Sequence, residues 1–153
     1  MQRCGGFERR LALHSFARNV MQIHGGCHCG SIRYEAEVDP ARTTLCHCTD
    51  CQKLTGTAYR VSVPAREGSF RLVSGTPSVY IKVADSGSRR ALAFCATCGS
   101  PLYAHDADHP KIYGLRVGCI DEREALVPTA QKWCRSALKW TGDLTGLPGR
   151  EGE

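Results

Sequence analysis

The sequence predicts an all-β domain with antiparallel pairing throughout and little helix. Its apolar residues recur in short runs in which every second side chain is apolar, a pattern typical of half-buried strands. No segment keeps a helical period over several turns. Residues that favour turns, mainly Gly, Pro, Asp and Ser, separate the runs. A chain of 153 residues is long enough to bury a core and short enough to form a single domain.

The expected elements follow from these runs in chain order. The clearest strand covers residues 31–38, in which every second side chain is apolar and one face would be buried. Asp39-Pro40 is expected to end this strand as a turn. One helical turn is expected at residues 50–54, with Gly56 ending it. The remaining runs predict strands at residues 43–45, 57–63, 70–73, 79–83, 91–94, 102–103 and 111–117.

The composition changes along the chain and indicates three parts. Residues 1–20 carry four arginines and little strand pattern, so we interpret them as an N-terminal extension that is not native or is disordered. Met21 is then an alternative start of translation. Residues 21–142 form the predicted domain. Residues 143–153 are rich in Gly and Pro and are expected to be a flexible tail.

Charge and hydropathy limit the classes of partner. The net charge is +5, which suits a small anionic substrate as well as a polymer. The chain has no Lys/Arg run of the nucleic-acid-binding type, so a nucleic-acid partner is not expected. No apolar run approaches the roughly 20 residues of a membrane helix, and no signal peptide is recognisable. We therefore expect a cytoplasmic protein with no membrane partner; a homo-oligomer remains open.

Cysteines provide the strongest signal for chemistry. Seven of the 10 cysteines fall into three clusters, whereas Cys4, Cys119 and Cys134 stand apart. Thiolates are preferred ligands of zinc, which takes four ligands in structural sites and three protein ligands in catalytic sites. Seven ligands therefore divide naturally as four plus three. The clusters are Cys27-His28-Cys29, the segment Cys46-His47-Cys48-Thr49-Asp50-Cys51, and Cys95-Ala96-Thr97-Cys98.

The cysteine pattern has two other interpretations. A disulfide framework usually belongs to a secreted protein, and the close Cys spacing suits one ion better than loop-closing bridges. A zinc ribbon made from Cys48, Cys51, Cys95 and Cys98 also satisfies the spacing, although it leaves three cysteines unexplained. Spacing alone does not decide between the ribbon and other groupings.

Other residues near the clusters have ordinary structural interpretations. On an extended strand, His28 and His47 would point away from the metal that their neighbours bind, so neither is predicted as a ligand. Trp133 and Trp140 are expected to pack in the core rather than stack on a ligand.

The three clusters and their flanking residues resemble one known family. Residues 25–34 resemble the opening motif of the glutathione-dependent formaldehyde-activating enzyme family, which includes centromere protein V. Residues 46–56 resemble its second motif, and residues 94–102 its third. Residues 117–121 and the segment around the two tryptophans resemble its C-terminal part. Three clusters in the family's order are a far more specific signal than any one CxxC pair.

The resemblance implies a fold and a set of ligands. The fold would be Mss4-like, with several small antiparallel sheets joined around zinc, and residues 21–142 would be a zinc-binding domain of the formaldehyde-activating type. One structural and one catalytic zinc would be bound. The resemblance assigns Cys27, Cys29, Cys95 and Cys98 to the structural zinc, and Cys46, Cys48 and Cys51 to the catalytic zinc.

The resemblance also implies an activity. The chain would be a zinc-dependent carbon–sulfur lyase of the S-(hydroxymethyl)glutathione synthase type, combining glutathione or a similar thiol with formaldehyde or another small aldehyde. Cys46, Cys48 and Cys51 would be its catalytic residues, and Arg60 and Lys53 are candidate partners for the carboxylates of glutathione. The alternative is a non-catalytic, zinc-stabilised binding module, because a fold does not determine a function.

Overall fold

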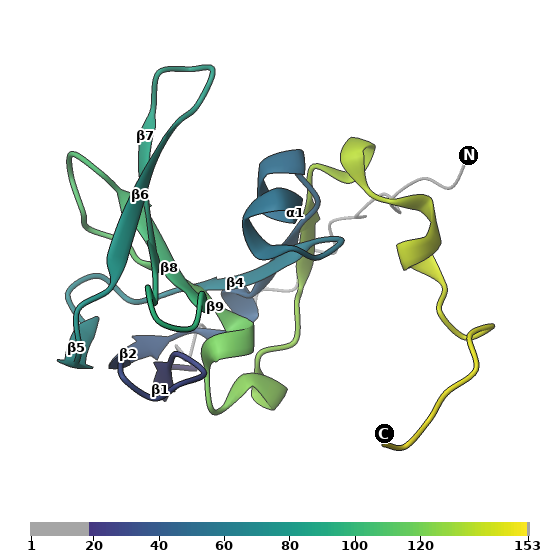
Figure 1. Cartoon of the computed structure of the whole chain (residues 1–153), viewed down its shortest axis with the longest axis horizontal. Helices are drawn as coiled ribbons and strands as arrows, with labels where there is room; N and C mark the ends of the chain where they lie inside the picture. The colour runs from purple at the N-terminus through teal and green to yellow at the C-terminus, as the bar shows by residue number, and fades with distance from the viewer. Residues whose placement is uncertain (1–18, 153) are drawn as a thin grey trace, which may run out of the picture.

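The computed structural model describes residues 19–152, so nearly all of the predicted N-terminal extension lies outside the described residues. Within this range the chain is built mainly from short strands (Figure 1). No helix in this part of the chain is long and apolar enough to cross a membrane.

The strands and the α-helix are β1 (Met21–Gly26), β2 (Arg33–Val38), β3 (Thr44–Cys46), α1 (Thr49–Thr55), β4 (Arg60–Pro64), β5 (Arg71–Ser74), β6 (Ser78–Val83), β7 (Arg89–Phe94), β8 (Pro101–Asp106), β9 (Gly114–Arg116) and β10 (Ala130–Lys132). Short 3₁₀ helices are η1 (Pro40–Arg42), η2 (Val117–Cys119), η3 (Arg123–Ala125), η4 (Cys134–Ser136) and η5 (Lys139–Gly142).

The strands form two sheets, which confirms the all-β class. One sheet has three strands in the order β1-β2-β5, and the other has seven in the order β10-β3-β4-β9-β8-β7-β6. The prediction of antiparallel pairing throughout is wrong at one edge, where β10 pairs with β3 in parallel. A parallel neighbour needs a crossover connection. The long segment between β9 and β10, which contains η2 and η3, supplies it.

The core lies between the two sheets. On β2 every second residue, beginning with Tyr34, is buried, as the alternation predicts. These side chains pack against the face of the larger sheet that carries Val63 and Leu115, both fully buried. Figure 1 shows β1 and β2 on one side of β4 and β9, and α1 on the other side. The larger sheet therefore has one face that forms the core and one face that carries α1.

The predicted helical turn is confirmed and slightly extended. The helix α1 begins after Cys48, whose sulfur accepts a hydrogen bond from the backbone N–H of Cys51 as an N-cap. It ends at Gly56, which adopts a left-handed conformation with φ of 64°. The turn chemistry thus fixes both ends of a helix that contains Cys51 and is capped by Cys48.

Gly75 is the basis of a first prediction. It has a φ of 74°, and a Cβ atom at this position would lie 2.2 Å from the carbonyl oxygen of Ser31. We expect Gly75→Ala to lower the free energy of unfolding by about 2–4 kcal/mol, because a left-handed conformation and a backbone overlap add their costs. Gly87 has a similar φ of 82° but open space around it, so Gly87→Ala should cost only about 1 kcal/mol. Urea unfolding of the two variants checks this, and equal losses would contradict it.

Candidate metal centres and the adjoining cavity

Four cysteines from two turns converge where the two sheets meet. Cys27 and Cys29 lie in the turn between β1 and β2, and Cys95 and Cys98 lie in the turn between β7 and β8. Their four sulfur atoms lie within 4.8 Å of one another. The three-stranded sheet and the seven-stranded sheet are therefore joined at this four-cysteine group.

The two turns of the four-cysteine group are built alike. In the first, the N–H of Gly30 donates to the carbonyl of Cys27 at 3.0 Å, and in the second the N–H of Gly99 donates to the carbonyl of Cys95 at 2.8 Å. Both glycines have a positive φ, of 78° and 75°. The extended strand assumed for His28 is therefore wrong, because β1 ends at Gly26 and Cys27-His28-Cys29 lies in the tight turn that follows.

Two serine hydroxyls contact the sulfurs of this group. Ser31 Oγ lies 3.1 Å from Cys29 Sγ and 3.5 Å from Cys27 Sγ, and Ser100 Oγ lies 3.2 Å from Cys98 Sγ. The Ser31 hydroxyl is the main cause that lowers the pKa of Cys27 to about 7. The Ser100 hydroxyl is the main cause that lowers the pKa of Cys98 to about 5. The two serines therefore favour the thiolate, the form that binds a metal, at Cys27 and Cys98. The pKa of Cys29 is raised, because the lowering by Ser31 is outweighed by hydrogen bonding to Cys27 and by burial.

Neither serine is among the predicted site residues, although the chain contains a signal for them. The tripeptide Cys-Gly-Ser occurs at Cys29-Gly30-Ser31 and again at Cys98-Gly99-Ser100. In each copy the glycine makes the turn and the serine hydroxyl returns to a cysteine sulfur. The repeat is thus one structural unit used twice.

The other three cysteines converge at the end of β3 and the start of α1. Cys46 ends β3, Cys48 caps α1 and Cys51 lies in its first turn. The sulfur of Cys51 lies 2.8 Å from that of Cys48 and 3.3 Å from that of Cys46. Burial opposes ionisation of Cys48, but hydrogen bonds from Cys51 lower its pKa overall. Among residues 19–152, no further Cys, His, Asp or Glu joins this three-cysteine group.

Both groups bring their sulfurs close enough together to hold one metal ion each, and the spacing in the four-cysteine group is close to that of zinc thiolates. Four thiolates at about 2.3 Å from zinc in a tetrahedron are about 3.8 Å apart. In the four-cysteine group, Cys29 Sγ lies 3.4 Å from Cys27 Sγ and 3.7 Å from Cys95 Sγ. The zinc-ribbon grouping is wrong, because Cys95 and Cys98 meet Cys27 and Cys29 instead of Cys48 and Cys51. None of the seven clustered cysteines forms a disulfide, so the disulfide interpretation receives no support from them.

The segment that contains β10 packs against the three-cysteine group. His47 is buried, and its Nε2 lies 2.9 Å from Oε1 of Gln131 on β10. The side-chain amide of Gln52 donates to the carbonyls of His47 at 2.9 Å and of Ser136 at 3.0 Å. The two glutamines hold the backbone around Cys46 and Cys48 in place. Neither glutamine is among the predicted site residues, because the contacts of His47 with Gln131 and of Gln52 with Ser136 depend on the place of β10 beside β3.

The prediction that both tryptophans pack in the core is wrong. Trp133 is 53% exposed and Trp140 is 60% exposed. Trp133 follows the edge strand β10 and has a φ of 59°, so the chain leaves the sheet at this residue and runs over the surface. The guanidinium of Arg135 lies 4.8 Å from the Trp133 ring centroid, which is a cation–π contact.

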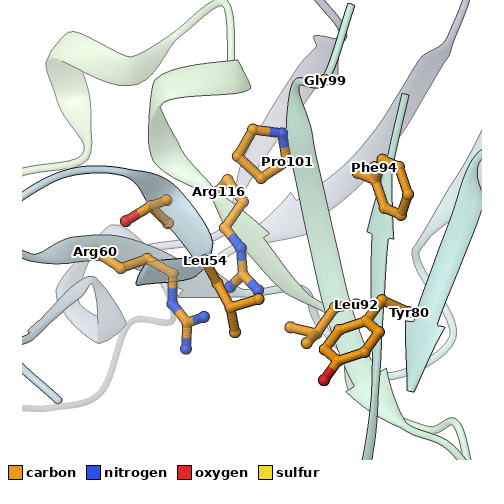
Figure 2. Close-up of a pocket in the computed structure, with 9 residues that line it drawn as sticks. Leu54, Arg60, Tyr80, Leu92, Phe94, Gly99, Pro101 and Arg116 are labelled. Carbon is orange, nitrogen blue, oxygen red and sulfur yellow. The ribbon is translucent and has the colours of Figure 1, made fainter. Parts of the chain in front are cut away.

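A cavity of about 200 Å³ lies on the α1 side of the large sheet (Figure 2). No cysteine lines it, but its wall includes residues next to both cysteine groups, among them Thr55 of α1 and Gly99. Residues directly opposite each other on paired strands share a face. Cys46 is opposite Arg60, and Ser62 is opposite both Thr44 and Arg116, so the cysteine and the two arginines share this face. Leu54 and Thr55 of α1 and the apolar side chains of Leu92 and Phe94 complete much of the cavity wall. Of the two candidate cations, Arg60 lines the cavity and Lys53 does not.

Comparisons with known proteins agree with this arrangement. The family model for the glutathione-dependent formaldehyde-activating enzyme matches residues 22–136. A Halomonas elongata protein named "Putative glutathione-dependent formaldehyde-activating enzyme" is 28% identical over 109 residues, covering 66% of this chain and 67% of that protein.

A solved structure also resembles this chain. The crystal structure of a Rhodobacter sphaeroides protein superposes with a TM-score of 0.54 and 24% identity, and the match covers 71% of this chain and 98% of that one. The prediction of an all-β, Mss4-like fold is confirmed. Because the family model spans all seven clustered cysteines, the chain belongs to the glutathione-dependent formaldehyde-activating enzyme family.

Proposed function

We propose that this protein is a zinc-dependent carbon–sulfur lyase of the S-(hydroxymethyl)glutathione synthase type. It would combine glutathione, or a similar thiol, with formaldehyde or another small aldehyde. The observation that carries the proposal is the three-cysteine group, which has no fourth protein ligand among the described residues and shares helix α1 with the wall of a cavity lined by two arginines. Membership of the family supports the same activity.

The two cysteine groups would have different roles. Cys27, Cys29, Cys95 and Cys98 would hold a structural zinc, because four sulfurs close the coordination shell. Cys46, Cys48 and Cys51 would hold a catalytic zinc. When bound there, zinc supplies positive charge that favours the deprotonated form of a substrate thiol.

The chain's own residues would bind and orient the two substrates. The carbon–sulfur bond forms when the thiol sulfur adds to the carbonyl carbon, and the thiol proton ends on the carbonyl oxygen, so neither an oxidant nor a reductant is needed. The guanidinium of Arg60, opposite Cys46 on the neighbouring strand, would stabilise negative charge beside the three sulfurs. Holding thiol and aldehyde together in the cavity replaces a bimolecular encounter by a reaction between bound partners.

Metal content and exchange kinetics test this proposal together. We expect one zinc ion for each of the two cysteine groups, measured by mass spectrometry of the native protein. We also expect catalytic amounts of the protein to accelerate the interconversion of glutathione, formaldehyde and their adduct, measured by exchange NMR. A zinc-loaded, folded protein that leaves the exchange rate unchanged would instead be a non-catalytic, zinc-stabilised binding module.

A further inference from the structure

Arg116 is a buried cation without an acidic partner in the described part of the chain. It is only 6% exposed, and no carboxylate of residues 19–152 forms an ion pair with it. Its Nη1 donates to Ser62 Oγ at 3.3 Å and to the carbonyl of Gly114 at 3.4 Å. Charged side chains are rarely buried without a counter-charge. The fold therefore maintains a guanidinium without a carboxylate partner at this position, and the groups near it that can carry negative charge are the thiols of Cys51 and Cys119.

A second arginine increases the excess of positive charge. Arg60 lines the same cavity, and its Nε is buried without a hydrogen-bond partner in the described residues. Burial, followed by the nearness of Arg60, lowers the pKa of Arg116 to about 9, which still leaves it charged at neutral pH. Two like charges on neighbouring strands repel each other, so their position is unfavourable until an anion enters.

The cavity has a polar side and an apolar side. Figure 2 shows Arg60 and Arg116 on one side and Leu92, Phe94 and Tyr80 on the other. Guanidinium groups bind carboxylates with two parallel hydrogen bonds, and the apolar wall suits the methylene groups beside a carboxylate. Formaldehyde is small and neutral, so it uses neither feature.

The cavity is continuous with the elements that hold the three-cysteine group. Thr55, in its wall, donates from its hydroxyl to the carbonyl of Cys51 at 2.6 Å. A substrate whose sulfur lies at the three cysteines would extend its remaining atoms along this wall. Resting on the function proposed above, we propose that Arg116, with Arg60, binds a carboxylate of the thiol substrate and so selects carboxylate-bearing thiols.

Binding of a thioether analogue separates this role from catalysis. S-methylglutathione carries both carboxylates but has no free thiol, and its diethyl ester lacks both charges. We expect Arg116→Gln to weaken binding of S-methylglutathione to the zinc-loaded protein about tenfold to a hundredfold, the size of a lost charge-assisted hydrogen bond. Binding of the diethyl ester should not change. Two monoethyl esters, one at the glycyl and one at the glutamyl carboxylate, then identify which carboxylate is bound. Only the ester that blocks the bound carboxylate should lose the dependence of binding on the arginine.

Controls cover folding and charge. Arg71→Gln is the matched control, because Arg71 lies on the other sheet and pairs with Glu35 at 2.7 Å; it should leave binding of both ligands unchanged. If circular dichroism shows that Arg116→Gln does not fold, Arg60→Gln carries the same expectation. An equal effect of the arginine variants on the acid and the diester would overturn the inference, because the arginines would then compensate the charge of the cysteine group.

Kinetics distinguish failure of this inference from failure of the proposed function. In the exchange assay, Arg116→Gln should raise KM for glutathione and change kcat little, as expected for lost ground-state binding. A wild-type protein that accelerates exchange of glutathione and of its diester equally keeps the proposed function and overturns the carboxylate role. A wild-type protein that binds S-methylglutathione over its diester, in an arginine-dependent way, but does not accelerate exchange keeps the carboxylate role and overturns the proposed function.

Discussion

Replacing Cys98 with serine is expected to unfold the domain. Cys98 belongs to the four-cysteine group, which joins the turn between β1 and β2 to the turn between β7 and β8 and so connects the two sheets. Structural zinc sites supply about 10–16 kcal/mol of binding free energy, and whole domains are stable by only about 5–15 kcal/mol. Serine is a much poorer zinc ligand than cysteine, so the expected loss of zinc-binding free energy is as large as the free energy of unfolding of the whole domain. Far-UV circular dichroism and urea unfolding measure the loss.

Cys119 provides the control for this prediction. It is a half-buried thiol outside both groups, and its sulfur donates to the carbonyl of Pro101 at 3.2 Å. A serine hydroxyl keeps this donor, so Cys119→Ser should change the free energy of unfolding by no more than about 1 kcal/mol. If Cys98→Ser keeps the wild-type unfolding midpoint, the four-cysteine group does not stabilise the fold through a metal.

Local patterns predicted the parts of the fold that depend on local chemistry. The alternation in residues 31–38 matches the buried face of β2, and Gly56 ends α1 as expected. The strand β10 was missed, because Ala130-Gln131-Lys132 has neither alternation nor β-branched residues. Its place beside β3 depends on a crossover whose path no local pattern encodes. The exposure of Trp133 follows from the same edge position, so local patterns could not predict it either.

The candidate site also has parts that the sequence predicted and parts that it did not. Clustering of the cysteines is visible in the sequence, but the partners of each pair are far apart along the chain, and only the family resemblance assigned them. Arg116 was missed because Leu115-Arg116-Val117 reads as part of an apolar strand. A charge inside such a run is itself a signal, since a strand beside a core has one face for apolar side chains and another that can carry function.

Replacing Cys48 with serine is expected to abolish catalysis and leave the fold intact. The three-cysteine group lies at the end of β3 and the start of α1 and does not connect the two sheets. Serine is also a good helix N-cap, so its hydroxyl can still accept the hydrogen bond that Cys48 receives from the N–H of Cys51. The unfolding midpoint in urea should therefore stay close to that of the zinc-loaded wild type.

The loss of activity from Cys48→Ser should be large, because Cys46 and Cys51 would supply only two of the three sulfurs that the proposed catalytic zinc needs. Even residues that only support a metal ligand change metal affinity or activity by about 10–100-fold, so loss of a ligand itself should lower the exchange rate by at least about 100-fold. Exchange NMR measures this rate, and mass spectrometry should show that only the ion of the four-cysteine group remains. If Cys48→Ser unfolds the domain as Cys98→Ser does, both groups are structural, and the division of labour on which the proposed reaction depends is wrong.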